Sequence, residues 1–212
     1  MARLSGTGLL ADDLYLLAHH DVTGRAYLQP RATGLGLAGA LLAELVLAGK
    51  IRFWPAGLVV TGGPLPQDEL ACAVLALLSS ETRPARDWLL FLSRSAAREV
   101  AGRLERAGYL MRVGSRRPWR DERWVPMDPD CAFASVVRVR AALDQARTPT
   151  ITSVTLAGLA AACGLSTRLA PYASGGALRA LEQSVRRLPP DLREVVGQTQ
   201  AALDGLLLAQ RV

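Results

Sequence analysis

Residues 35–51 read LGLAGALLAELVLAGKI, and this stretch decides the fold. Apolar and small side chains fill nearly every position, and Glu44 is the only charged residue before Lys50. A helix that is apolar on almost all sides is typical of a protein interior, and Gly49 is well placed to end it. Because a bilayer span needs about 20 apolar residues, this shorter, interrupted run predicts the buried central helix of a soluble domain.

In the rest of the chain, on both sides of this stretch, hydrophobic periodicity predicts a mainly α fold. We expect a single globular helical domain over residues 1–212, built around the central helix, with small β-hairpins of which one is basic and protrudes. The other predicted helices span residues 6–18, 69–80, 83–93, 96–107, 129–147, 152–164, 168–187 and 190–210. The predicted strands span residues 25–28, 51–54, 57–60, 109–113 and 123–126.

Composition limits the class of protein. Half of the 212 residues are apolar, which suffices for a sizeable core. With 24 arginines and one lysine, the net charge is +6, which favours an anionic partner, either phospholipid or nucleic acid. The preference for arginine is typical of a GC-rich bacterial genome. Cys72, Cys131 and Cys163 show no CxxC spacing and indicate buried free thiols. The first residues lack a secretory signal pattern, so we expect a cytoplasmic protein.

The excess positive charge is concentrated in the basic helix and hairpin, residues 94–126. Residues 94–123 contain nine arginines against four acidic residues, which gives +5 of the chain's net charge of +6. Arginine suits phosphate because its planar fork donates two hydrogen bonds. Trp119 and Trp124 suit either a membrane interface or stacking on a base. The structural alternative is a solvated hairpin tip whose tryptophans pack against the body of the protein or a second subunit.

The order of the segments resembles the Golgi phosphoprotein 3-like family. The residues that match its opening are Leu14, Leu16, Leu17, Asp21, Gly24 and the run at 36–51. Residues 96–128, a helix that stops at a glycine before a β-hairpin, also follow the family's order. The resemblance implies a non-enzymatic protein. Its eukaryotic members bind phosphatidylinositol 4-phosphate at Golgi membranes and recruit the tails of glycosyltransferases.

The resemblance also implies a headgroup pocket, made of a tryptophan before the central helix, an arginine at its start and two arginines before the hairpin. The tryptophan position falls near Gln29 here, and the arginine position at the helix start holds Ala38. One arginine before the hairpin is kept, and the other falls at Ala97 or at its arginine neighbour, depending on the alignment. Two further arginines close to the missing positions could compensate. The expected headgroup-binding residues are Arg94, Arg98, Arg31 and Arg25.

No enzyme signature emerges from the residues. Residues 34–39 match the glycine spacing of a dinucleotide fingerprint, but no βαβ unit surrounds them and no ribose-binding acid follows about 20 residues later. His19 and His20 are adjacent rather than spaced as metal ligands, and we expect them at an exposed helix end. Without a histidine partner, Ser93 and Ser95 cannot form a catalytic triad. We therefore expect no enzymatic activity, no cofactor and no metal.

Three acidic residues are candidates for a site, and Glu44 is the one that lies inside an apolar helix. We expect Asp12 and Asp13 to be charges near the N-terminus of the first helix, where they interact favourably with the helix dipole. A buried charge needs a partner, so we expect Glu44 to pair with an arginine. The less favoured alternatives are a metal site at the two aspartates and a general base at Glu44.

Three functions remain compatible with the sequence. The favoured one is a peripheral membrane protein that binds an anionic phospholipid headgroup, of the phosphatidylinositol 4-phosphate type, on the inner face of a membrane. The second is an interaction scaffold that forms a homo-oligomer through the hairpin, with Trp119 as its anchor. The third, a winged-helix-like DNA-binding protein, is disfavoured because the helix at 96–107 lacks the Asn, Gln, Ser or Thr side chains that read bases. The residues expected to contact a membrane or partner are Arg116, Arg117, Trp119, Arg120 and Trp124.

Overall fold

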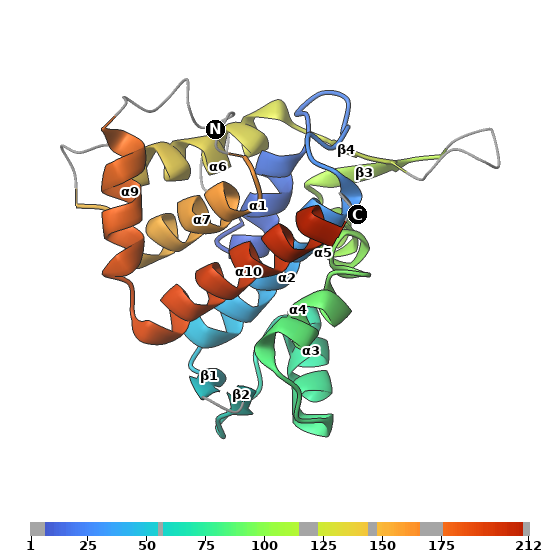
Figure 1. The fold of residues 1–212 in the computed structure, drawn as a ribbon. Coiled ribbons are helices and arrows are strands. Elements are labelled where there is room, and N and C mark those ends of the chain that lie inside the picture. The colour runs from blue at the N-terminus through green and yellow to red at the C-terminus, as the bar shows by residue number, and fades with distance from the viewer. Residues whose placement is uncertain (1–6, 55–56, 115–122, 144–147, 166–175, 210–212) are drawn as a thin grey trace.

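The computed structural model describes residues 7–54, 57–114, 123–143, 148–165 and 176–209. Helices and two small antiparallel sheets make up these ranges (Figure 1), so the predicted mainly α fold is confirmed. The helices are α1 (Leu10–Ala18), α2 (Pro30–Leu47), α3 (Glu69–Ser80), α4 (Ala85–Leu92), α5 (Ala96–Arg106), α6 (Pro129–Leu143), α7 (Ile151–Ala162), α9 (Ala177–Arg186) and α10 (Pro190–Ala209). The strands are β1 (Ile51–Trp54), β2 (Gly57–Val60), β3 (Leu110–Val113) and β4 (Arg123–Pro126).

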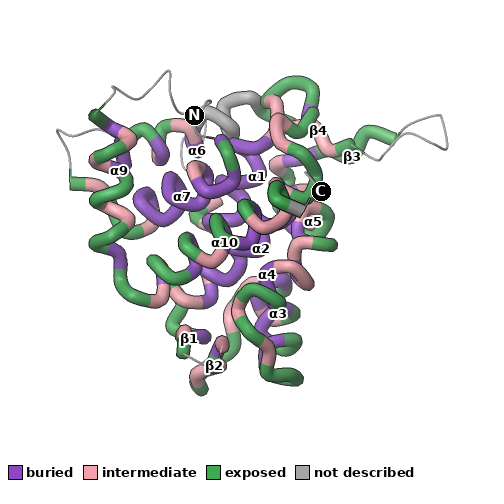
Figure 2. The backbone as a smooth tube through the Cα atoms, viewed as in Figure 1, coloured by how far each residue is buried: buried purple, intermediate pink, exposed green. Residues whose placement is uncertain are grey.

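α2 is the centre of the fold. Its side chains Leu35, Leu37, Leu42 and Leu45 are at most 1 % exposed, and α1, α4, α5, α7 and α10 all pack against it. Figure 2 shows buried residues concentrated in α1, α2 and α7. The prediction of a buried central helix is therefore confirmed. Among the described residues α2 alone has the length and hydropathy of a membrane span, but 67 % of that stretch is buried within the fold, as in a core helix.

The start of α2 differs from the prediction. We predicted a strand at residues 25–28 that Pro30 ends, whereas the structure has an isolated bridge between His19 and Ala26 there. Pro30 instead opens α2. Proline favours this position because its fixed φ fits a helix and the N–H that it lacks would have no partner there.

Small residues on α2 allow its neighbours to approach closely. A Cβ added at Gly36 would clash with the Cys163 sulfur, and one at Gly39 would clash with the Thr199 hydroxyl of α10. At the other end of α10, Asp191 accepts a hydrogen bond of 2.9 Å from the backbone N–H of Phe53, in the strand that follows α2. α10 is therefore antiparallel to α2, and its C-terminal end lies beside the start of α2 (Figure 1).

The two β-hairpins agree with the predicted ones. β1 pairs with β2 from Ile51 opposite Val60 to Trp54 opposite Gly57. β3 pairs with β4 over Leu110–Val113 and Arg123–Pro126. β3 and β4 extend away from the helical body (Figure 1), which confirms a protruding hairpin in its described residues.

The C-terminal helices follow the predicted order with different bounds. α7 begins at Ile151 because the Thr150 side chain caps it, accepting a hydrogen bond from the backbone N–H of Ser153. The helix predicted for residues 168–187 is described as α9, which begins at Ala177. Residues 166–175, like residues 144–147 at the end of another predicted helix, lie outside the described ranges.

Candidate anion-binding site

Two of the expected headgroup residues lie around the first turn of α2. A Cβ at Gly34 would clash with the backbone carbonyl of Ser93, so the start of α2 packs directly on the turn between α4 and α5. Arg94 follows Ser93 in this turn. Arg31 precedes Gly34 by three residues and therefore lies on the same face of α2. Both guanidinium groups belong to exposed residues and have no acidic partner among the described residues.

The N-terminus of α2 adds positive potential near these two arginines. Gln29 provides no side-chain cap, and the first turn contains no acidic residue. The first N–H groups of a helix lack intrahelical acceptors, and the helix dipole places about half a positive charge at this end. The Thr33 hydroxyl in the same turn is buried without a hydrogen-bond partner in the described structure. Such a terminus, flanked by two arginines, can hold a phosphate or another anion.

The other two expected headgroup residues occupy different settings. Arg98, in the first turn of α5, has a side chain that is 72 % exposed and lies 3.4 Å from the Glu99 carboxylate. Arg25 is exposed in the turn after α1. Gly24 of this turn has a φ of +62° and packs so closely on the Trp124 carbonyl that a Cβ would clash there. The structure thus brings Arg31 and Arg94 to the start of α2 and places Arg25 beside β4.

The described part of the basic hairpin packs against α5. Trp124 donates a hydrogen bond of 2.9 Å from its indole N–H to the Glu105 carboxylate, and the Arg112 guanidinium lies 5.3 Å from the centre of its ring. These contacts hold Trp124 half-buried against the body of the protein. Arg116, Arg117, Trp119 and Arg120 lie outside the described residues.

The family-like pocket positions are unsuited to a headgroup here. Ala38 is fully buried in the middle of α2, so its side chain faces the core rather than a ligand. Gln29 is exposed but neither aromatic nor charged. Neither position therefore offers a charged or aromatic group to a phosphate headgroup.

A buried ionic network is the main feature that the sequence reasoning missed. Arg103 of α5 is 5 % exposed and donates hydrogen bonds to Asp12 at 2.8 Å, to Glu44 at 3.1 and 3.2 Å and to Asp68 at 3.0 Å. The expected pairing of Glu44 with an arginine is confirmed. Glu44 also accepts a hydrogen bond of 2.7 Å from the backbone N–H of Ala11. The network joins α1, α2, α5 and the N-cap of α3.

Asp12 and Asp13 lie in the first turn of α1, as predicted, but their contacts extend beyond the helix end. Both are buried, at 2 % and 0 % exposure, because all of α1 is enclosed. Asp13 forms an ion pair with Arg138 and accepts a hydrogen bond of 3.0 Å from the Ser135 hydroxyl. Two adjacent aspartates in an otherwise apolar helix, together with Glu44, were the available signal for a buried network.

Burial changes the pKa values of the ionisable groups in this network. Desolvation raises the pKa of Asp12 and of Glu44, although Arg103 opposes the rise. Desolvation likewise raises the pKa of Asp13 against the effect of Arg138. For Arg103, the carboxylates outweigh desolvation and raise its pKa. Four carboxylates, counting Asp68, thus share two guanidinium groups. This arrangement joins helices in the interior of the fold and forms no open site.

The histidines show no catalytic arrangement. His19, expected at an exposed helix end, is half-buried: its Nδ1 lies 2.7 Å from the Tyr15 carbonyl and its ring stacks on the Tyr15 ring at 3.9 Å. Burial lowers the pKa of His19. Within the described ranges, no group of three or more His, Cys, Asp or Glu side chains is placed to hold a metal ion.

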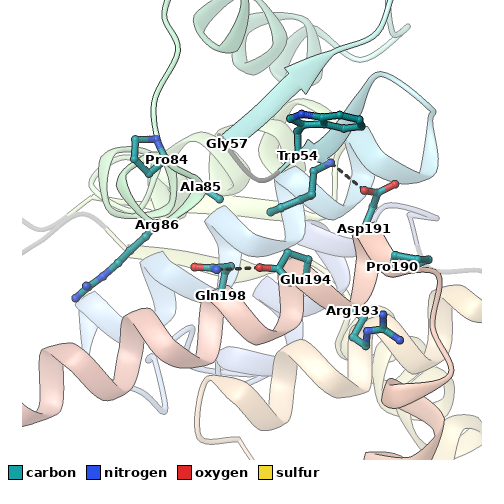
Figure 3. Close-up of a pocket in the computed structure, with 11 residues that line it drawn as sticks. Trp54, Gly57, Pro84, Ala85, Arg86, Pro190, Asp191, Arg193, Glu194 and Gln198 are labelled. Carbon is teal, nitrogen blue, oxygen red and sulfur yellow. Dashed lines mark hydrogen bonds between the residues drawn. The ribbon is translucent and has the colours of Figure 1, made fainter.

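A separate open pocket of about 520 Å³ lies between β1–β2, the start of α4 and the first turns of α10 (Figure 3). Its polar groups largely satisfy one another. Gln198 donates to Glu194 at 2.9 Å, and Asp191 is bound by the Phe53 backbone. Arg193 donates to the Arg186 carbonyl at 3.0 Å. Arg86 also lines the pocket and is exposed, with no ion pair among the described residues, so it is the cation that the pocket offers to a ligand.

Comparison with known proteins supports the resemblance seen in the sequence. The family model described as Golgi phosphoprotein 3 (GPP34) matches residues 10–200. No individual curated protein matches the chain. The match covers the central helix, the network around Arg103 and the basic hairpin, and so extends over most of the chain. This protein belongs to the Golgi phosphoprotein 3 (GPP34) family.

Proposed function

We propose that this protein is a non-enzymatic peripheral membrane protein that binds an anionic phospholipid headgroup of the phosphatidylinositol 4-phosphate type. The observation that supports the proposal is that the turn with Arg94 packs on the first turn of α2, which contains Arg31 and has no side-chain cap. Membership of the Golgi phosphoprotein 3 family agrees with it. The protein works in the cytoplasm and attaches to the inner face of a membrane.

Each part of the site contributes to phosphate binding. A guanidinium donates two parallel hydrogen bonds to phosphate oxygens, and Arg31 and Arg94 have no competing acid within the described structure. The α2 N-terminus adds backbone N–H donors. Basic residues near an anionic leaflet contribute about 1 kcal/mol each. A handful of such residues gives attachment that is useful and reversible.

The test is co-sedimentation with liposomes at near-physiological salt, comparing neutral vesicles with anionic vesicles that include phosphatidylinositol 4-phosphate. The double variant Arg31→Ala, Arg94→Ala should lose most of the binding to anionic vesicles. The matched control is Arg179→Ala, Arg187→Ala, which removes the same charge from exposed residues in and just after α9. This control should retain nearly all of the binding.

Competition separates the site from general polyanion attraction. Duplex DNA added to the binding mixture should not displace vesicles from a headgroup site, although both ligands are polyanions. No binding of the wild-type protein to any vesicle would refute the proposal and leave an interaction scaffold as the better explanation. Equal losses in the α2 variant and the α9 control would show that net charge alone controls attachment.

A further inference from the structure

The last turn of α10 exposes two adjacent leucines. Leu206 packs against the core, whereas Leu207 is 48 % exposed and Leu208 is 64 % exposed. One turn earlier, Leu203 is buried. The helix therefore places one apolar face on the core and continues with two leucines that face solvent. Their exposed apolar area is available to an apolar partner at this end of the helix.

These leucines lie at the same end of the molecule as the α2 N-terminus. α10 is antiparallel to α2, with Thr199 against Gly39 in the middle of both helices. Eight residues onward from Thr199 comes Leu207, and eight residues back from Gly39 comes Arg31. Figure 1 shows the end of α10 next to the start of α2. The two exposed leucines thus lie at the same end of the α2–α10 pair as Arg31.

A third cation borders the same surface. A Cβ added at Gly205 would lie 2.9 Å from the guanidinium of Arg86, so this exposed arginine of α4 covers the helix just before the leucines. Asp204, one turn before Leu208, is exposed and must stay in water. Insertion into an apolar phase is therefore limited to the last turn of the helix.

We propose that Leu207 and Leu208 form an apolar anchor that enters the acyl boundary of an anionic bilayer while Arg31, Arg94 and Arg86 meet its headgroups. The inference rests on the proposed function and specifies how the membrane is approached. Apolar side chains beside basic ones are the pattern of interfacial helices, whose attachment combines buried apolar area with attraction to anionic lipid. An anionic bilayer complements the three cations.

A second copy of the chain fits the same surface poorly. A symmetric dimer interface brings the same patch of both subunits together, so it would place the arginines of one copy against those of the other. Like charges at close range disfavour that pairing. An anionic bilayer can bury the leucines in its acyl boundary and at the same time pair the arginines with its headgroups.

The first experiment measures vesicle binding of the full chain with Leu207→Ser, Leu208→Ser. We expect the affinity for anionic vesicles to fall about tenfold or more, because both side chains lose their transfer to the acyl boundary. Preference for anionic over neutral vesicles should persist, since the arginines remain. The control Val59→Ser, Leu77→Ser removes two side chains of 49 % and 41 % exposure from β2 and α3 and should bind as the wild type does. Unfolding by urea checks that each variant is folded.

The second experiment reports the environment of the helix end directly. An NBD fluorophore is attached to Leu208→Cys, with Val59→Cys as the comparison, in a background where Cys72 and Cys131 are serine. Emission at position 208 should shift to the blue on anionic vesicles, and emission at position 59 should not. Position 59 belongs to the hairpin next to the start of α10, and residues 191 and 207 of that helix are about 24 Å apart along its axis.

The outcomes separate this inference from the proposed function. Wild-type affinity in the leucine variant, with no blue shift at position 208, would overturn the anchor while binding that depends on Arg31 and Arg94 still supports the headgroup site. A blue shift that grows with protein concentration in the absence of vesicles would overturn the anchor in favour of self-association. Absence of vesicle binding by the wild type would refute both.

Discussion

Arg103 and the pair formed by Arg31 and Arg94 use the same side chain in opposite ways. Arg103 is 5 % exposed and meets three carboxylates, whereas the pair is exposed and meets none among the described residues. Burial of a guanidinium requires partners that compensate for lost hydration. An arginine that is counted in the net charge of a segment is therefore not always available at the protein surface. One of the nine arginines at residues 94–123 is neutralised by acids from outside that segment.

Removal of the buried arginine should have the largest effect on stability. Arg103→Met keeps an apolar stem of similar length but leaves Asp12 and Glu44 buried without their cation. Breaking a buried ion pair on one side costs about 3–5 kcal/mol. We expect the free energy of unfolding, measured by urea denaturation with circular dichroism, to fall by about this amount.

The same substitution on the exposed face of α5 is the control. Arg106 is exposed on the same helix, and Arg106→Met should change the free energy of unfolding by less than about 0.5 kcal/mol. Similar losses for both variants would mean that the carboxylates around Arg103 contribute no more to stability than an ordinary surface position does.

The contact between the first turn of α2 and the turn that carries Arg94 is the next place to test. Gly34→Ala adds a Cβ that would clash with the Ser93 carbonyl, and overpacking of this kind costs about 1–3 kcal/mol. The same change should move Arg31 away from Arg94 and weaken binding to anionic vesicles. Gly102→Ala is the control, because its Cβ would have only the Arg106 guanidinium nearby, at 3.6 Å. Alanine in a helix gains up to about 1 kcal/mol over glycine, so that variant should be no less stable.

The pH dependence of stability should follow the excess of carboxylates in the network. Burial raises the pKa of Asp12, Asp13 and Glu44, so the folded state binds more protons than the unfolded state above the ordinary carboxyl range. Stability must then fall as the pH rises through that window toward the raised pKa values. Denaturation at a series of pH values above the ordinary carboxyl range should show this fall, and Glu44→Gln should make it shallower. An unchanged slope in Glu44→Gln would assign the pH dependence to other groups.

The fold could be predicted where the pattern is local. The apolar run at residues 35–51 and the glycine stop at Gly108 each depend on neighbours in sequence, and α2 and the β3–β4 hairpin appear as expected. The strand at residues 25–28 failed because a short run before a proline is equally a loop that leads into a helix. Propensity alone could not decide between them.

The candidate site depends on an arrangement that the sequence alone does not show. Arg31 and Arg94 were both named, yet only the packing of Gly34 on Ser93 brings them to one place. Asp12 and Arg103 are far apart in the chain, and their pairing depends on the way in which α1 and α5 pack. Long-range partners of this kind leave no periodic signal in one sequence, so the network around Arg103 could not be predicted from it.

The smallest effect on stability is expected for the two arginines of the proposed headgroup site. Arg31→Ala, Arg94→Ala removes no ion pair within the described residues, so the free energy of unfolding should change by less than about 0.5 kcal/mol. Loss of like charge near a positive helix end should even favour the fold slightly. The same variant should lose most of its affinity for anionic vesicles, and the dependence of binding on salt should weaken. A loss of stability comparable to that of Arg103→Met would instead make these two arginines part of the structural framework. The comparison between buried and exposed arginines would then no longer hold.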